Sequence, residues 1–346
     1  MSAATGREQT TGIRGLALNQ MRTLGLVMAI VVIGLVFQSQ RQAFLTSANL
    51  LTLLRSMASL GIIAFAQLLV ILLGEIDLSV GAVYGLTGTT LAVLWLGGGA
   101  LPFTVPFFAA LLIALGVAVL IGAANAFLTT VIGIPSFIAT LGFLSLAEGT
   151  ELLLSNASTF NPAYNDPPPP AGELSVFAAL GGTELPFGIP IQVIWLVAAF
   201  VLFFVLRHRT LFGFRLMAIG GNAKAAEIAR LPIRRYKFVV FMLCSLMAGV
   251  AGILDFSYVG SIGPSSGGSL NFQVIAAVVI GGASLNGGRG TITGTLIGAI
   301  LLAELANGLA LLGVGAFAQL LFVGFVTIGA VAVDRLTREA APGGQA

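Results

Sequence analysis

The stretch RHRTLFGFRLMAIGGNAKAAEIARLPIRRYK, residues 207–237, decides how this chain is arranged, because it carries eight of the sixteen lysines and arginines. Long apolar runs flank it on both sides, at about 190–206 and 237–258. Cytoplasmic loops of membrane proteins are enriched in lysine and arginine. The stretch is therefore predicted to be a cytoplasmic loop between two membrane spans.

The composition of the whole chain agrees with a membrane protein. Of its 346 residues, 57% are hydrophobic and 8% are charged, against about 25% charged residues in an ordinary soluble domain. The mean hydropathy is +1.03. This much apolar surface cannot be hidden inside a soluble fold. The composition excludes a water-soluble enzyme, a disordered chain and a nucleic-acid-binding domain.

The number of spans follows from the apolar runs and the positive charges. A membrane helix needs about 20 mostly apolar residues. The predicted spans lie at about 23–38, 53–73, 78–96, 105–128, 136–154, 190–206, 237–258, 270–285, 291–312 and 315–333. With ten spans and both termini in the cytoplasm, fourteen cationic residues fall inside and only Arg41 and Arg55 fall outside.

We therefore expect an all-α polytopic membrane protein of about ten helices. A cytoplasmic tail, 1–22, precedes a membrane domain, 23–333, and a second cytoplasmic tail, 334–346, follows it. The first span could instead be a signal peptide, but no small-residue cleavage site follows it, so a membrane anchor is favoured.

Two longer loops are predicted on opposite sides of the membrane. Residues 155–189 contain four consecutive prolines, 167–170, and three acidic residues, but no lysine or arginine. A proline run is extended and stiff, so this segment is either an external cap or a plain connector. Residues 207–236 form the long cytoplasmic loop.

Glycine recurs at helical spacing within the spans. The chain has 45 glycines, about twice the usual share. Gly290, Gly294 and Gly298 are spaced four residues apart, as are Gly81 and Gly85. Glycines at i and i+4 make a flat face against which another helix can pack closely. Such a face serves either static packing or helices that slide during transport, and the two are compatible.

The chain lacks the residues that nucleotide hydrolysis, a disulfide or a metal site would need. A nucleotide-hydrolysing P-loop requires a lysine followed by serine or threonine after a glycine-rich turn, and neither Lys224 nor Lys237 fits. His208 and Cys244 are the only histidine and cysteine, which excludes an intrachain disulfide and a cysteine- or histidine-rich metal site. We predict no catalytic, cofactor or metal site, so the chain is not an enzyme by itself.

Polar side chains within the spans are candidates for a solute path. Acids inside a membrane are costly and often functional. Asp255 and Glu304 are two such acids, and Glu304 could serve an ion-driven carrier. The other polar groups are amides and hydroxyls, which suit a neutral polyhydroxylated solute but equally suit helix–helix hydrogen bonds. The predicted solute path comprises Gln67, Asn125, Asn271, Gln273, Ser284 and Asn307.

A short helix is predicted inside the cytoplasmic loop. Gly220-Gly221 break the chain after an apolar run, and Asn222 is a favourable helix N-cap. Ala223–Ala229 is strongly helix-forming, and Pro232 ends the helix. Such a helix could lie on the membrane surface with a basic rim. It could instead dock into a separate ATPase subunit.

Four blocks of sequence resemble those of a known family. They are GEIDLSVG at 74–81, PSFIATLG at 135–142, the segment 209–233, and IGGASLNGGRGTITGTLIG at 280–298. Together they are similar to the sugar-type ABC importer permeases, such as the ribose and xylose permeases, within the branched-chain amino acid transport permease superfamily. The resemblance extends from about residue 45 to 333.

The resemblance implies a type II ABC importer permease in a bacterial inner membrane. Such a permease forms the pore as a dimer, with a second copy or a paralogue. It receives a monosaccharide from a periplasmic substrate-binding protein and is driven by a cytoplasmic ABC ATPase, which uses ATP and Mg²⁺. Lipid surrounds it, and nucleic acid plays no part. The implied ATPase-coupling residues are Gly220, Gly221, Asn222, Ala225, Ala226 and Glu227.

The cargo is left open by departures from the family's blocks. Glu75 stands where the family has a glycine, and Asn271 and Gln273 stand where it has acids. The same machine could carry a branched-chain amino acid, a nucleoside or another small solute. A different class, an ion-coupled secondary carrier, would need no ATPase.

Overall fold

Helices form most of the described chain, which in this computed structural model comprises residues 23–315, 318–325 and 328–329. Within these residues the backbone forms isolated bridges but no strand. Helices are expected in a bilayer because they satisfy every backbone N–H and C=O internally. The main helices are Thr23–Gln40, α2 (Ser47–Leu72), α3 (Val80–Leu96), α4 (Phe107–Phe127), α5 (Ser136–Ser155), α6 (Ala171–Gly181), α7 (Gln192–His208), α8 (Leu211–Gly221), α9 (Ala223–Ile228), α10 (Ile233–Val259), α11 (Leu270–Ile280) and α12 (Ile292–Leu311).

Several of these helices are long and apolar enough to cross a membrane. Among the described residues there are six, or seven if α7 and α8, which are bent by 66°, form one broken span. The apolar helices α3, α6 and α11 are shorter. The all-α polytopic prediction is confirmed, while the count of ten spans and the side of each terminus stay predictions. The tails, 1–22 and 334–346, and much of the last predicted span, 315–333, lie outside the described residues.

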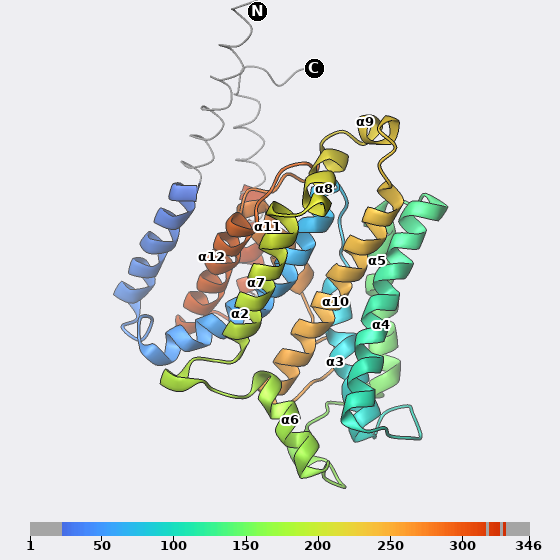
Figure 1. The fold of residues 1–346 in the computed structure, drawn as a ribbon. Coiled ribbons are helices and arrows are strands. Elements are labelled where there is room, and N and C mark those ends of the chain that lie inside the picture. Colours follow the sequence, from blue (N-terminus) through green and yellow to red (C-terminus); the bar gives the residue numbers. More distant parts are fainter. Residues whose placement is uncertain (1–22, 316–317, 326–327, 330–346) are drawn as a thin grey trace, which may run out of the picture.

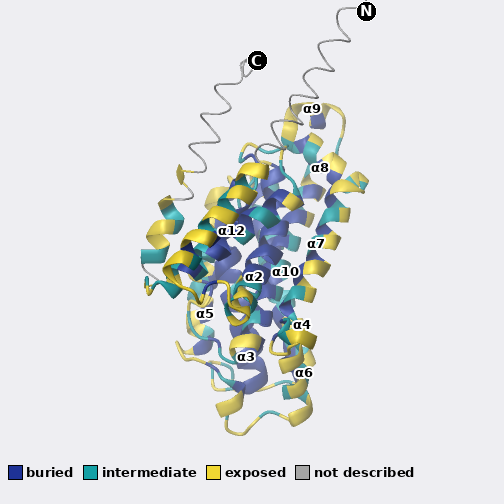
Figure 2. Ribbon diagram, turned by 90° about the vertical axis from the view of Figure 1, so that its left-hand side faces the viewer, coloured by how far each residue is buried: buried dark blue, intermediate teal, exposed yellow. Residues whose placement is uncertain are grey.

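Helix α2 forms the centre of the bundle. Every residue from Met57 to Leu72 is buried, and α2 packs against α7, α10, α11 and α12. Figure 2 shows the buried residues concentrated around α2, while outward-facing helices such as α7 carry many exposed residues. Many exposed side chains are large and apolar, such as Leu112, Leu120 and Leu153, as expected for a surface that faces lipid.

Glycines allow the close contacts between helices that the sequence predicts. A Cβ atom on Gly294 would lie 2.1 Å from the carbonyl oxygen of Gly281, and one on Gly298 would lie 2.1 Å from that of Ala277. These distances are too short for any side chain, so the backbones of α11 and α12 touch directly. The prediction of tight glycine packing is confirmed, and the sliding of these helices stays a prediction.

Some helix boundaries differ from those predicted. Helix α2 begins at Ser47, about six residues before the predicted start, because helix continues through the polar residues outside the apolar run. Helix α11 ends at Ile280, not at about 285. Its end is followed by Gly282, whose φ of +104° is a backbone conformation that only glycine adopts readily.

The two predicted loops also contain more structure than the sequence suggests. The loop at 155–189 includes α6, which begins directly after Pro170. The apolar run before Asn222 is itself a helix, α8, which continues through both glycines of the predicted break. The α8–α9 segment and the 155–189 loop with α6 lie at opposite ends of the bundle (Figure 1).

Candidate functional site

The short helix predicted in the loop 207–236 is present as α9, at the end of the bundle, and its role in coupling stays a prediction. The Oδ1 atom of Asn222 accepts a hydrogen bond from the backbone N–H of Ala225 at 2.9 Å, so Asn222 is the N-cap of α9 as predicted. Ala226 is the buried residue of α9. Ile228 is 85% exposed at the tip of the helix. Helix α9 therefore offers a free polar and apolar surface to a partner.

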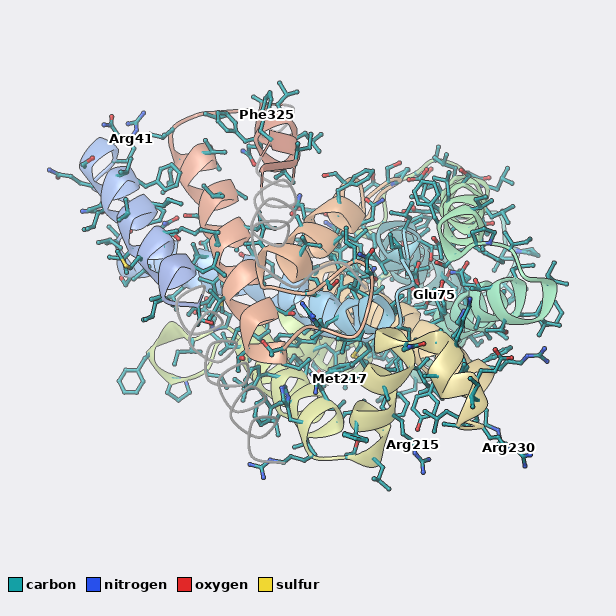
Figure 3. All side chains as sticks on the ribbon, turned by 90° about the horizontal axis from the view of Figure 1, so that it is seen from above. Arg41, Glu75, Arg215, Met217, Arg230 and Phe325 are labelled. Atoms are coloured by element: carbon teal, nitrogen blue, oxygen red, sulfur yellow. The ribbon has the colours of Figure 1, made fainter. Side chains whose placement is uncertain are left out.

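Basic side chains surround this helix. Seen from the α9 end of the bundle, Arg215 and Arg230 project outward from the α8–α9 segment (Figure 3). Arg230 also has a φ of +56°, which an arginine rarely adopts. It follows α9 directly and helps turn the chain back toward α10.

The base of the α8–α9 segment is joined to the bundle through backbone atoms. The N–H of Gly288, in the turn between α11 and α12, donates to the carbonyl of Leu72 at the end of α2, at 2.9 Å. A Cβ atom on Gly220 would lie 1.7 Å from that same carbonyl oxygen and 2.8 Å from the Gly288 nitrogen. Three segments thus meet without intervening side chains. We therefore expect a displacement of α8 to move the end of α2 and the turn before α12.

An ion pair at the same end of the bundle accounts for one departure from the family's blocks. Glu75 forms a salt bridge with Lys237, near the start of α10. Their side chains are 14% and 22% exposed, respectively. Glu75, whose position Figure 3 marks, therefore connects the α2–α3 turn to α10.

Removing one member of this pair should cost more than removing both. Glu75→Gln or Lys237→Gln alone should lower the free energy of unfolding by about 1–3 kcal/mol, between the ranges for exposed and buried pairs. The double variant should recover part of this loss, because no charge is left unpaired. Thermal unfolding of the detergent-solubilised protein measures the effect, and strictly additive losses would contradict the pairing.

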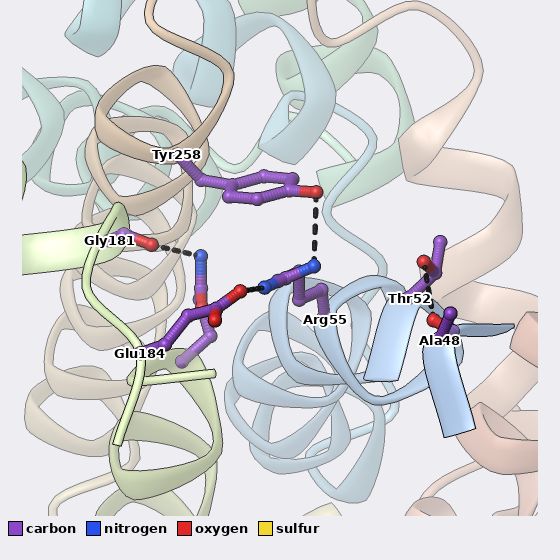
Figure 4. Close-up of polar contacts among 7 residues, drawn as sticks. Ala48, Thr52, Arg55, Gly181, Glu184 and Tyr258 are labelled. Atoms are coloured by element: carbon purple, nitrogen blue, oxygen red, sulfur yellow. Dashed lines mark hydrogen bonds and ion pairs between the residues drawn. The ribbon is translucent and has the colours of Figure 1, made fainter. Parts of the chain in front are cut away.

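At the opposite end, the 155–189 loop is tied to α2. An Nη atom of Arg55 lies 2.6 Å from a carboxylate oxygen of Glu184, and the guanidinium lies 4.7 Å from the centre of the Tyr258 ring (Figure 4). Gln192 donates to the carbonyl of Gly181 at 2.5 Å in the same region. Arginine fits both roles because its planar guanidinium pairs with carboxylates and stacks on aromatic rings.

A polar cavity lies close to this tie. Its volume is about 420 Å³. Arg55 lies about one helical turn before the lining residue Ser59, and Tyr258 lies about one turn after the lining residue Asp255. The polar side chains that line the cavity are Ser56, Ser59, Tyr84, Asp255, Ser266, Ser269 and Gln273.

Asp255 is the acid of this cavity, and it is held by two hydroxyls. One carboxylate oxygen accepts a hydrogen bond from Ser59 Oγ at 2.5 Å, and the other accepts from the Tyr84 hydroxyl at 2.7 Å. The three residues come from α10, α2 and α3. The carboxylate is thus fixed in orientation at a point where three helices meet.

A second cavity has a different character. Its volume is about 240 Å³, and it lies between the helix Thr23–Gln40 and α12. Phe37, Leu302 and Phe322 are among the apolar residues that line almost all of it. It offers little to a polar solute, so the cavity at Asp255 is the better candidate site.

The structure brings one residue of the predicted solute path, Gln273, to the polar cavity. Gln67 is fully buried in α2 and accepts a hydrogen bond from Cys244 Sγ at 3.1 Å. Asn307 and Asn49 exchange two amide hydrogen bonds, of 2.8 and 2.9 Å. These contacts join neighbouring helices, the alternative role that the sequence leaves open.

The other three path residues are also separate from the cavity. Asn125 is fully buried and donates to Ser79 Oγ at 3.0 Å. Asn271 is buried at the start of α11, and Ser284 is buried in the turn between α11 and α12. The six residues do not line one continuous cavity, and their role in transport stays a prediction.

Two further buried acids, Asp77 and Glu151, have structural contacts. One oxygen of Asp77 accepts from both the backbone N–H and the hydroxyl of Ser79, at 2.9 and 2.6 Å. This arrangement closes the turn that begins α3. Glu151 accepts from the Thr89 hydroxyl at 3.2 Å. Among the residues described, no three His, Cys, Asp or Glu side chains gather as a metal site would require.

The chain matches one family model over residues 49–331, that of the branched-chain amino acid transport system permease component. The chain belongs to this family. The permease is a transport subunit and not an enzyme, and it is a multi-pass membrane protein. The resemblance found in its four blocks is confirmed.

Curated relatives match almost the whole permease. The ribose import permease protein RbsC of Bacillus subtilis is 37% identical over 91% of this chain and 93% of its own length. The probable ABC transporter permease protein YphD of Escherichia coli is 36% identical, over 90% and 89%. The xylose transport system permease protein XylH of Escherichia coli is 30% identical, over 94% and 95%. No solved structure matches the permease.

Most of the residues that line the cavity have no distinguishing pattern in the sequence. Ser59, Tyr84, Ser266 and Ser269 were not among the predicted residues. Asp255 gave a signal, since an acid within an apolar span is often functional. Its hydroxyl partners lie 171 and 196 residues away in the chain, so no local pattern could join them to it.

Proposed function

We propose that this permease is the membrane channel of an ATP-driven importer for a neutral monosaccharide of the ribose or xylose kind. It would span a bacterial inner membrane about ten times, with both termini and α9 in the cytoplasm. A second permease copy or a paralogue would complete the pore. A periplasmic binding protein would deliver the solute, and a separate ATPase would supply the energy.

The polar cavity carries the proposal for the cargo. Its polar lining is made of hydroxyls, an amide and one carboxylate, groups that exchange hydrogen bonds with a polyhydroxylated solute. Its lining includes no lysine or arginine. The names of the related ribose and xylose permeases support the same class of cargo, a monosaccharide.

The orientation is supported by charge. The α8–α9 end contains the basic loop, while the opposite end contains the proline-rich acidic loop. Cytoplasmic loops are the ones enriched in lysine and arginine. This distribution of charge supports a cytoplasmic position for α9, where an ATPase could reach it.

The second candidate cargo is a branched-chain amino acid, as in the name of the matching family. An amino acid presents both an ammonium and a carboxylate group, and the lining of the cavity offers an acid for the first but no lysine or arginine for the second. Uptake into proteoliposomes that contain the permease, the ATPase and the binding protein separates the two. Labelled D-ribose or D-xylose should enter and labelled leucine should not. Leucine uptake without pentose uptake would overturn the sugar assignment. Uptake by the permease alone, driven by an ion gradient, would overturn the ATPase requirement.

The docking role of α9 gives a separate prediction. Glu227→Trp and Ile228→Arg alter the exposed tip of α9. Both should reduce copurification of the ATPase and uptake by roughly tenfold, because interface cores tolerate neither added bulk nor an unpaired charge. The matched control is Phe187→Arg, which alters a 96% exposed apolar residue in the loop at the other end. It should leave ATPase binding unchanged, and equal losses in all three variants would contradict docking at α9.

A further inference from the structure

The carboxylate in the polar cavity has acceptor capacity that the protein does not use. Asp255 receives one hydrogen bond on each oxygen, from Ser59 and from Tyr84. Each carboxylate oxygen has about two lone-pair sites, so both oxygens can accept one more donor. In the described part of the chain, the ion pairs join Arg55 to Glu184 and Lys237 to Glu75, and neither involves Asp255.

The hydroxyl oxygens of Ser59 and Tyr84 can also act only as acceptors toward a ligand. Ser59 and Tyr84 each have one O–H, and both donate it to Asp255. The oxygens that remain can only accept. The cluster of Asp255, Ser59 and Tyr84 therefore presents hydrogen-bond acceptors alone, which suits a ligand that brings several O–H donors.

Another part of the cavity wall is a glycine- and serine-rich segment of the chain. Residues 266–270 run along the cavity, and a Cβ atom on Gly267 would lie 1.7 Å from the carbonyl oxygen of Gly81. The segment is therefore pressed against α3 and keeps its position. From this side Ser269 and Gln273 add a hydroxyl and an amide that can donate to the ring or hydroxyl oxygens of a sugar.

We propose that Asp255, oriented by Ser59 and Tyr84, is a transit subsite that accepts hydrogen bonds from neighbouring hydroxyls of the sugar on its way through the permease. This inference rests on the proposed function and adds the residues that recognise the cargo. Hydroxyl donors to a carboxylate form short, charge-assisted hydrogen bonds. A solute without hydroxyls, or one with a carboxylate of its own, would be disfavoured.

The first test is transport. In proteoliposomes with the complete importer and saturating pentose-loaded binding protein, Asp255→Asn should reduce D-ribose or D-xylose uptake by about tenfold, as expected when a charged acceptor is replaced by a neutral one. Glu304→Gln is the matched control, because Glu304 is a buried acid of α12 that does not line the cavity. Its uptake should stay close to that of the wild type.

The second test separates recognition from helix packing. Cys244 is the single native cysteine and is fully buried, so Ser269→Cys places an accessible thiol in the cavity wall. A methanethiosulfonate reagent should label it, and D-ribose or D-xylose delivered by the binding protein should slow that labelling. Adding Asp255→Asn should remove the protection.

The outcomes are distinct. If Asp255→Asn lowers the thermal midpoint but leaves uptake per folded permease and thiol protection unchanged, the carboxylate only ties helices together and the inference fails. If the wild-type importer moves neither pentose, the proposed function fails and the inference falls with it. Loss of both uptake and protection in Asp255→Asn, with Glu304→Gln unaffected, supports the subsite.

Discussion

Gly220→Ala should reduce ATP-driven uptake by roughly tenfold or more, and Gly221→Ala, one residue further along, should have a much smaller effect. The first methyl group would lie 1.7 Å from the carbonyl oxygen of Leu72, while the second would meet nothing within 4 Å. The two substitutions are chemically identical and adjacent in sequence. They differ only in whether the new atom collides with the backbone of α2.

The collision falls at the place where α8 meets the rest of the bundle. The Leu72 carbonyl also accepts the hydrogen bond from Gly288, so a methyl group at Gly220 must displace one of these segments or the other. Overpacking of this kind destabilises the folded arrangement by about 1–3 kcal/mol and occasionally more. Since 1.4 kcal/mol corresponds to a factor of ten, we expect uptake to fall by roughly tenfold or more.

Two measurements separate loss of coupling from loss of folding. The amount of monodisperse permease after solubilisation reports folding, and sugar transported per ATP hydrolysed by the assembled importer reports coupling. A folded Gly220→Ala permease that still docks the ATPase but transports poorly would identify the junction as part of the coupling route. Wild-type uptake by Gly220→Ala would contradict the contact itself.

The sequence predicts those features of this permease that depend on neighbouring residues. The apolar runs predict helices because each run is long enough to cross a bilayer by itself. The cap at Asn222 follows from its own side chain and the alanine-rich segment after it. The spacing of Gly294 and Gly298 predicts close packing because residues four apart share one helix face. Gly290, which has the same spacing, lies before the start of α12 and so is not on that face.

The sequence does not predict features that depend on contacts between distant segments. The cavity at Asp255 combines side chains from several helices, and serine and tyrosine carry no local mark of such a role. Conversely, Gln67 and Asn125 look like solute ligands in sequence because they are amides in apolar runs. Their surroundings are set by tertiary packing, which places them against Cys244 and Ser79.

Gly122→Leu should strongly destabilise the permease, and Gly116→Leu in the same helix should be tolerated. Helices α4 and α10 are packed along much of their length. A Cβ atom on Gly122 would lie 2.6 Å from the carbonyl oxygen of Phe241 and 2.8 Å from the Cα of Met242. Both are backbone atoms, so no side chain can turn aside to make room.

The control residue occupies open space. A Cβ atom on Gly116 meets nothing within 4 Å, so its leucine would extend from the bundle. Leucine there should be neutral or slightly stabilising, because glycine is about 1 kcal/mol less favourable than alanine in a helix interior. Leucine at Gly122 must separate two helices whose attraction depends on close contact, since lipid tails solvate apolar side chains as well as a neighbouring helix does. We therefore expect Gly122→Leu to lower the free energy of unfolding by an amount at or above the upper end of the ~1–3 kcal/mol range for overpacking. The yield of monodisperse protein and its thermal midpoint measure this loss, and comparable values for the two variants would mean that α4 and α10 do not meet at Gly122.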